Sequence, residues 1–120
     1  MSRTVSSVSG LLLSMLAIST SAVAADEWHT CTPVQVMTFQ NRVHVRCVEI
    51  VDAPGSAGVK FLAVSTQDAE YSKRILTVLT AAQVNHRALS VLFDGSDESG
   101  RPWGCRIEDC RPLHAAGFGE

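Results

Sequence analysis

The chain is 120 residues long, with 46% hydrophobic residues, 10 Lys and Arg, 12 Asp and Glu, and a formal net charge of −2. A chain of this size supports one domain, because two halves would each be too small to bury a core. The acidic balance argues against a surface that neutralises phosphates, so we expect no nucleic-acid partner.

The first 24 residues have the three parts of a secretory signal peptide. Arg3 supplies a positive start, residues 11–18 form an apolar run, and the tripeptide ending at Ala24 is an A-x-A cleavage site. The apolar run is much shorter than the roughly 20 residues that a membrane-spanning helix needs. We therefore expect residues 25–120 to be a single periplasmic or secreted domain with no membrane span.

Two strands are predicted after a short polar lead at residues 26–30. Residues 33–39 alternate between apolar and polar side chains, and residues 42–51 do the same after a turn. The alternation in the second segment breaks near Cys47, since Glu49 would otherwise point inward. A β-bulge there is the simplest repair.

The middle of the chain predicts a loop, a third strand and a helix. Residues 53–58 are rich in Pro and Gly, and residues 59–64 are a short apolar strand. Ser65 and Asp68 then have the S-x-x-D spacing of a capping box at the start of a helix that ends near Asn85. Its apolar face repeats at helical spacing and includes Ile75, Leu76 and Leu79.

Two more strands are predicted, at residues 88–93 and from about Trp103, with a polar loop at residues 94–102 between them. The order is then β-β-β-α-β-β, mainly β with one helix, which is the order of the OB-fold. We therefore predict a five-stranded OB-fold-like barrel with the helix closing one end. An unclassified α+β domain is the alternative.

Four cysteines in a small exported domain predict two disulfides. We favour Cys31–Cys47, which flanks the first predicted hairpin, and Cys105–Cys110, which closes a short loop. Zinc is an alternative because histidines lie near three of the cysteines, and a redox-active dithiol is another. The chain has no C-x-x-C motif, which argues against both.

No catalytic constellation is recognisable. The chain lacks a G-x-S-x-G elbow, its four histidines are scattered, and its paired carboxylates lie in polar segments. The acidic loop from Asp94 fails the EF-hand pattern, because Ser99 stands at position six and Cys105 at position twelve. We expect no catalytic residues, no cofactor, no metal and no enzyme activity.

Ligand binding is predicted at the loop that leads to Trp103. Its indole, with Arg101 and Arg106 nearby and Arg111 further on, can stack on a sugar ring and engage an acidic group. The alternative is that Trp103 packs over the Cys105–Cys110 bridge while the arginines pair with Glu108 and Asp109. Trp28 is expected to pack as a staple onto the barrel.

The stretch 60–111, under half the chain, resembles the B subunits of AB5 toxins of the pertussis and subtilase types. The shared features are the export signal, the helix with Ala81-Ala82-Gln83 before the strand at 88–93, and the late cysteine pair. The resemblance implies a disulfide-bonded OB-fold that forms rings and binds cell-surface glycans. The chain departs from that family at Phe61-Leu62 and after Cys110, and no binding residue is transferred.

The sequence therefore favours an exported, non-enzymatic module that binds a glycan or a protein through Arg101, Trp103 and Arg106, and it allows a homo-oligomer. A second hypothesis is a periplasmic structural or accessory protein that contacts only an envelope protein. A periplasmic enzyme or metal carrier is the least favoured.

Overall fold

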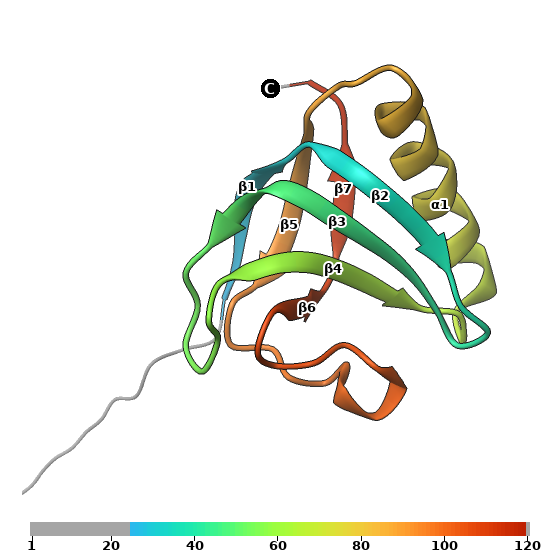
Figure 1. Cartoon of the computed structure of the whole chain (residues 1–120). Coiled ribbons are helices and arrows are strands. Elements are labelled where there is room, and N and C mark those ends of the chain that lie inside the picture. Colours follow the sequence, from blue (N-terminus) through green and yellow to red (C-terminus); the bar gives the residue numbers. More distant parts are fainter. Residues whose placement is uncertain (1–24, 120) are drawn as a thin grey trace, which may run out of the picture.

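The computed structural model describes residues 25–119, so the predicted signal peptide and its cleavage site lie outside the described part. The described chain is mainly β with one helix, as predicted (Figure 1). Its elements are β1 (Asp26–Cys31), β2 (Pro33–Thr38), β3 (Arg42–Val51), β4 (Val59–Ser65), α1 (Ala69–Val84), β5 (Leu89–Asp94), the 3₁₀ turn η2 (Arg101–Trp103), β6 (Cys110–Pro112) and β7 (Ala115–Gly117). Within residues 25–119, no helix combines the length and apolarity needed to cross a membrane.

The predicted five-stranded barrel was wrong in this respect: the seven strands of residues 25–119 form two sheets that are not closed into one barrel. One has the order β2-β3-β4-β6 and the other β1-β5-β7, and all neighbours are antiparallel except β4 and β6. Thr32 alone separates β1 from β2, so the chain turns from one sheet into the other at that corner. At the corner between β6 and β7, the Leu113 N–H donates to Ala63 in β4 and the His114 N–H to Leu92 in β5.

The core lies between the sheets and under α1. Alternate residues of β3 and β5 point inward, and α1 packs mainly against β2 and β7, so it covers one end of the core (Figure 1). Of the predicted apolar face of the helix, Ile75 and Leu79 are buried and Leu76 is half-buried. Each fully buried aliphatic side chain contributes about 1.5–3 kcal/mol to folding.

The predicted start of the helix was wrong by one turn. Asp68, not Ser65, is the N-cap residue, and its Oδ1 accepts the Tyr71 N–H at 3.1 Å. Ser65 ends β4, and its Oγ instead accepts the N–H of Gln67. Asp68 has the extended backbone that an N-cap requires, whereas Ser65 is held in the sheet. The predicted end of the helix at Asn85 is confirmed.

Two strand predictions were also wrong. Residues 26–30 are not a polar lead but most of β1, whose His29 ring stacks on Phe93 at 4.5 Å. The segment at Trp103 is the turn η2, and the last strand region begins only at Cys110. Pro102 has no N–H to give to a sheet, and the flanking glycines suit a turn, so this segment cannot continue as a strand.

Both predicted disulfides, Cys31–Cys47 and Cys105–Cys110, are present and leave no free cysteine. No thiolate is therefore left to hold zinc as the alternative required. The first bridge stabilises by about 3 kcal/mol on the chain-entropy model, because it closes a loop of roughly 15 residues.

The Glu49 side chain is hydrogen-bonded to Thr32, the residue at the corner between β1 and β2. The pairing of β3 with β4 slips between Arg46 and Val51, which matches the expected irregularity, but Glu49 is not turned outward. Its carboxylate accepts the Thr32 N–H at 2.6 Å and the Thr32 hydroxyl at 2.7 Å. Burial raises the pKa of Glu49, but these hydrogen bonds outweigh it and hold the pKa below its usual value.

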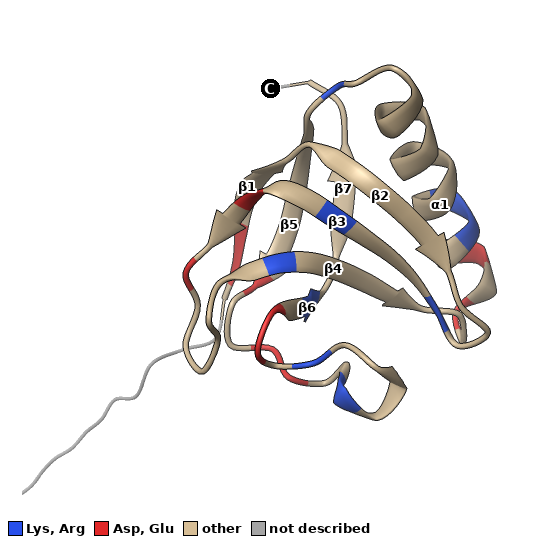
Figure 2. Ribbon diagram, in the orientation of Figure 1, with Lys and Arg blue, Asp and Glu red and all other residues tan. Residues whose placement is uncertain are grey.

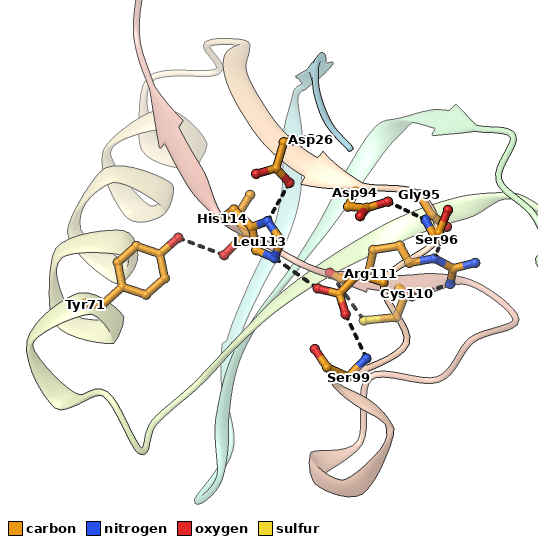
Figure 3. Close-up of polar contacts among 11 residues, drawn as sticks. Asp26, Tyr71, Asp94, Gly95, Ser96, Ser99, Cys110, Arg111, Leu113 and His114 are labelled. Carbon is orange, nitrogen blue, oxygen red and sulfur yellow. Dashed lines mark hydrogen bonds and ion pairs between the residues drawn. The ribbon is translucent and has the colours of Figure 1, made fainter. Parts of the chain in front are cut away.

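Arg111 is fully buried, with 0% of its surface exposed, so its predicted place beside a ligand was wrong. Its guanidinium donates to four backbone carbonyls at 2.6–2.8 Å, those of Pro54, Gly95, Ile107 and Cys110. Figure 3 shows Arg111 with two of these partners, Gly95 and Cys110. Cys110 precedes Arg111 in β6, whereas Pro54 lies in the loop between β3 and β4, and Gly95 and Ile107 lie near the two ends of the segment between β5 and β6. Arg111 therefore fixes that loop and that segment to one another beneath β6.

Replacing Arg111 with Met keeps much of the volume and removes every donor. We expect a loss of about 3 kcal/mol in the free energy of unfolding, because buried carbonyls lose a charged donor. Urea denaturation measures it, with Arg106→Met as the control, since Arg106 is exposed and should change stability by less than about 0.5 kcal/mol. Equal midpoints for the two variants would contradict the anchoring role of Arg111.

Candidate functional site

Arg101 and Arg106, two of the predicted ligand residues, line one shallow hollow of about 250 Å³ with Ile107 and Glu108. Nε of Arg106 lies 3.6 Å from Oε1 of Glu108, and Nη1 of Arg101 lies 3.7 Å from Oε1 of Glu98. Both ion pairs are solvent-exposed, and exposed pairs contribute little. Both guanidinium groups can therefore turn to an incoming anion at low cost.

Trp103, the third predicted ligand residue, does not line this Arg101–Arg106 hollow. It is half-buried and packs with Phe61 against the Cys105–Cys110 disulfide and Ala63. The alternative for Trp103, packing over the bridge, is thus confirmed. The same alternative paired the arginines with Glu108 and Asp109, and of these pairs the Arg106–Glu108 ion pair is present.

The outer face of the four-stranded sheet carries a group that the sequence did not indicate. We name it the arginine–aromatic face, and it consists of Phe39, Arg42, His44, Arg46 and Phe61. It forms because Val43, Val45 and Cys47 of β3 point into the core, which leaves the alternate residues outside. The β3–β4 register then sets Arg46 opposite Phe61.

Ring contacts hold this face together. The His44 ring centroid lies 4.7 Å from that of Phe61 and 5.8 Å from that of Phe39. The Arg42 guanidinium lies 3.9 Å from the centre of the Phe39 ring, a cation–π contact. The rings of Phe39, His44 and Phe61 thus form a connected row that runs from the turn between β2 and β3 to β4.

Arg42 also joins this face to the loop that carries the predicted ligand residues. It donates to the Trp103 carbonyl at 3.3 Å and to Nδ1 of His44 at 3.4 Å. Gly104 makes the approach possible, because a Cβ there would lie 2.5 Å from Nη1 of Arg42. Gly104 also has a φ of 100°, which side chains rarely adopt.

The electrostatics of the face favour an anion. Burial and the Arg42 charge lower the pKa of His44, and Asp109 only partly opposes them. A neutral His44 that accepts from Arg42 at Nδ1 carries its proton on Nε2, which is then a donor. Figure 2 shows basic positions along β3 and β4, and among residues 25–119 no ion pair involves Arg42, Arg46 or Lys60.

A second polar cluster is centred on His114, between β6 and β7. Its Nδ1 lies 2.6 Å from Asp26 and its Nε2 lies 3.0 Å from Asp97 (Figure 3). Burial lowers the pKa of His114, but the two carboxylates outweigh burial and raise it. Both ring nitrogens are engaged, so His114 has no free nitrogen to activate a nucleophile.

Trp28 is not the staple that was predicted. Its side chain is on the outer face of β1 and is 62% exposed. With Phe118 it lines a shallow apolar groove of about 420 Å³, whose floor includes Ala116 and Gly117. The Arg87 guanidinium lies 4.5 Å from the centre of the Phe118 ring.

Comparison with known proteins does not assign the chain. No protein-family model matches it, and no curated protein matches its sequence.

His44 and His114, whose ring nitrogens are hydrogen-bonded, should have pKa values on opposite sides of the ordinary histidine pKa of 6.5. We expect His44 to titrate below that value and His114 above it, as measured by NMR of the ring protons against pH. Asp97→Asn should lower the midpoint of His114 and leave that of His44 unchanged. The reverse order of midpoints would contradict the described contacts.

Proposed function

We propose that this chain is an exported, non-enzymatic binding module that captures an acidic glycan. The ligand lies on the arginine–aromatic face and extends to the Arg101–Arg106 hollow. The observation that carries the proposal is a set of three cations, Arg42, Arg46 and Lys60, that form no ion pair within residues 25–119 and lie near the rings of Phe39 and Phe61.

The chemistry of the face suits such a ligand. A guanidinium binds a carboxylate or sulfate through two parallel hydrogen bonds, which an ammonium cannot do. Aromatic faces offer apolar area to the C–H side of a sugar ring. Nε2 of His44 adds a neutral donor for a hydroxyl group. A small number of placed polar groups on a mainly apolar surface is typical of ligand sites.

We further propose that the domain is an OB-fold in which two strands are broken. β1 and β2 would be the two halves of strand one, and β6 and β7 those of strand five. The pairing order β2-β3-β4-β6 followed by β7-β5-β1 supports this, because it returns to the strand where it began. OB-folds bind oligosaccharides on strands two and three and on the loops beside them. In this chain those strands are β3 and β4.

The resemblance to B subunits of AB5 toxins supports the same class of ligand. The two disulfides support an oxidising compartment, as export would provide. Ring formation by several copies is part of this proposal.

A second candidate is an accessory protein that contacts an envelope protein. The groove between Trp28 and Phe118 favours it, because exposed apolar area of that kind is typical of protein contacts. Such a protein would bind no glycan and would co-purify with its partner.

Arg46→Ala and Arg101→Ala should each weaken binding of a carboxylated oligosaccharide about tenfold, because each removes one charge-assisted contact. Isothermal titration calorimetry measures the affinity, with the neutral parent oligosaccharide as the ligand control. Arg74→Ala is the matched protein control, since Arg74 is an exposed arginine on α1. It should bind as the unmodified protein does.

Two results would overturn the proposal. One is that no acidic oligosaccharide on a glycan array binds better than its neutral parent. The other is that Arg74→Ala weakens binding as much as Arg46→Ala, which would show attraction to overall charge rather than to this face.

A further inference from the structure

The contacts of His114 connect three distant parts of the chain. Asp26 begins β1 and lies 88 positions from His114 in sequence, and Asp97 lies 17 positions away in the loop after β5. His114 itself stands at the corner where the chain leaves one sheet for the other. We name these three residues the Asp26–His114–Asp97 clasp.

The clasp reaches the proposed ligand site through Asp97. One carboxylate oxygen of Asp97 contacts His114, and the other accepts the Ser99 N–H at 2.8 Å. From there successive turn hydrogen bonds continue to η2, in which the Trp103 N–H donates to the Gly100 carbonyl. A change at Asp97 therefore acts on the segment that carries Arg101 and Trp103.

Other charged and titratable groups near His114 come from α1. Tyr71 donates its hydroxyl proton to the Leu113 carbonyl at 2.7 Å, and burial raises its pKa to about 12, so it stays neutral. Arg74 lines the same hollow as His114 and lies 3.8 Å from Glu70. The direct partners of the imidazole remain the two carboxylates.

Both carboxylates accept hydrogen bonds, and this sets the protonation state that the clasp requires. An imidazolium has two N–H donors and satisfies Asp26 and Asp97 together. A neutral imidazole has one N–H and one lone pair, so one carboxylate must then face a lone pair. The contact with Asp97, at 3.0 Å, is longer than that with Asp26, at 2.6 Å, and is the one expected to open.

We propose that the Asp26–His114–Asp97 clasp is a pH-sensitive device that holds the loop with Arg101 and Trp103 in place while His114 is protonated and releases it on deprotonation. Its effect on ligand affinity rests on the proposed glycan-binding function. Its effect on the loop does not.

The pH window follows from the directions of the two shifts. The pKa of His114 is raised, so its contribution is complete below the ordinary value of 6.5 and is lost as pH rises through the raised value. Burial raises the pKa of Asp97, but hydrogen bonds from Ser99 and His114 outweigh it and lower the pKa. Asp97 therefore stays ionised until pH falls below its ordinary value of 3.8. The clasp is closed between these limits.

Amide hydrogen exchange tests the loop directly. In the unmodified protein, protection of the Ser99 and Trp103 amides, relative to Val91 in β5, should fall about tenfold between pH 5.5 and pH 9, because one charge-assisted contact is lost. In His114→Gln it should be low at both pH values. His86→Asn is the matched control: His86 is exposed, and Asn tolerates its positive φ of 54°.

If His114→Gln does not fold, Asp97→Asn serves instead, since its amide can both donate and accept and should remove the pH dependence. The same dependence in the unmodified protein and both variants would overturn the clasp. Loop opening with unchanged affinity for the carboxylated oligosaccharide would overturn its regulatory role. Loop opening in a protein that binds no acidic glycan at either pH would support the clasp and refute the proposed function.

Discussion

The buried guanidinium of Arg111 is the constraint on which the loop side of the molecule depends. A cation without solvent must be fully hydrogen-bonded, and here backbone carbonyls rather than a carboxylate meet that need. The loop that carries the proposed ligand residues is held at Gly95 and Ile107 by Arg111 and between them at Asp97 by His114. In the proposed clasp, the His114 anchor depends on the protonation of its imidazole, whose pKa the two carboxylates raise. The loop then has one permanent attachment, at Arg111, and, in the proposed clasp, one attachment that responds to pH, at His114.

Features that depend on local pattern could be predicted from the sequence. Alternation located β3 and β5, helical spacing located α1, and cysteine number and spacing predicted both disulfides. Features for which two local patterns compete could not be predicted from the sequence. Ser65 and Asp68 both suit an N-cap, and the sheet decides between them by holding Ser65. The polar residues of β1 hid a strand because its partner β5, far along the chain, supplies the apolar neighbours.

The residues of the candidate site likewise fall into those whose proximity the sequence indicated and those whose proximity it did not. Arg101 and Arg106 lie in one polar segment, so their proximity was visible in the sequence. The contact of His44 with Phe61 depends on the β3–β4 register, and a slip of one residue would turn one ring into the core. No local pattern relates His114 to Asp26, because only the sheet pairing and the corner after β6 bring them together.

The overall negative charge also misleads about this surface, because many of its carboxylates are engaged within the fold. Asp26 and Asp97 contact His114, Glu49 contacts Thr32, and Asp68 caps α1. Arg42 and Arg46 of β3 form no ion pair within residues 25–119, and an acidic protein thereby presents a basic face. A DNA-binding protein commonly makes about 6–10 phosphate contacts, more than the few cations here provide. This comparison favours the compact acidic glycan that we propose over a long polyanion.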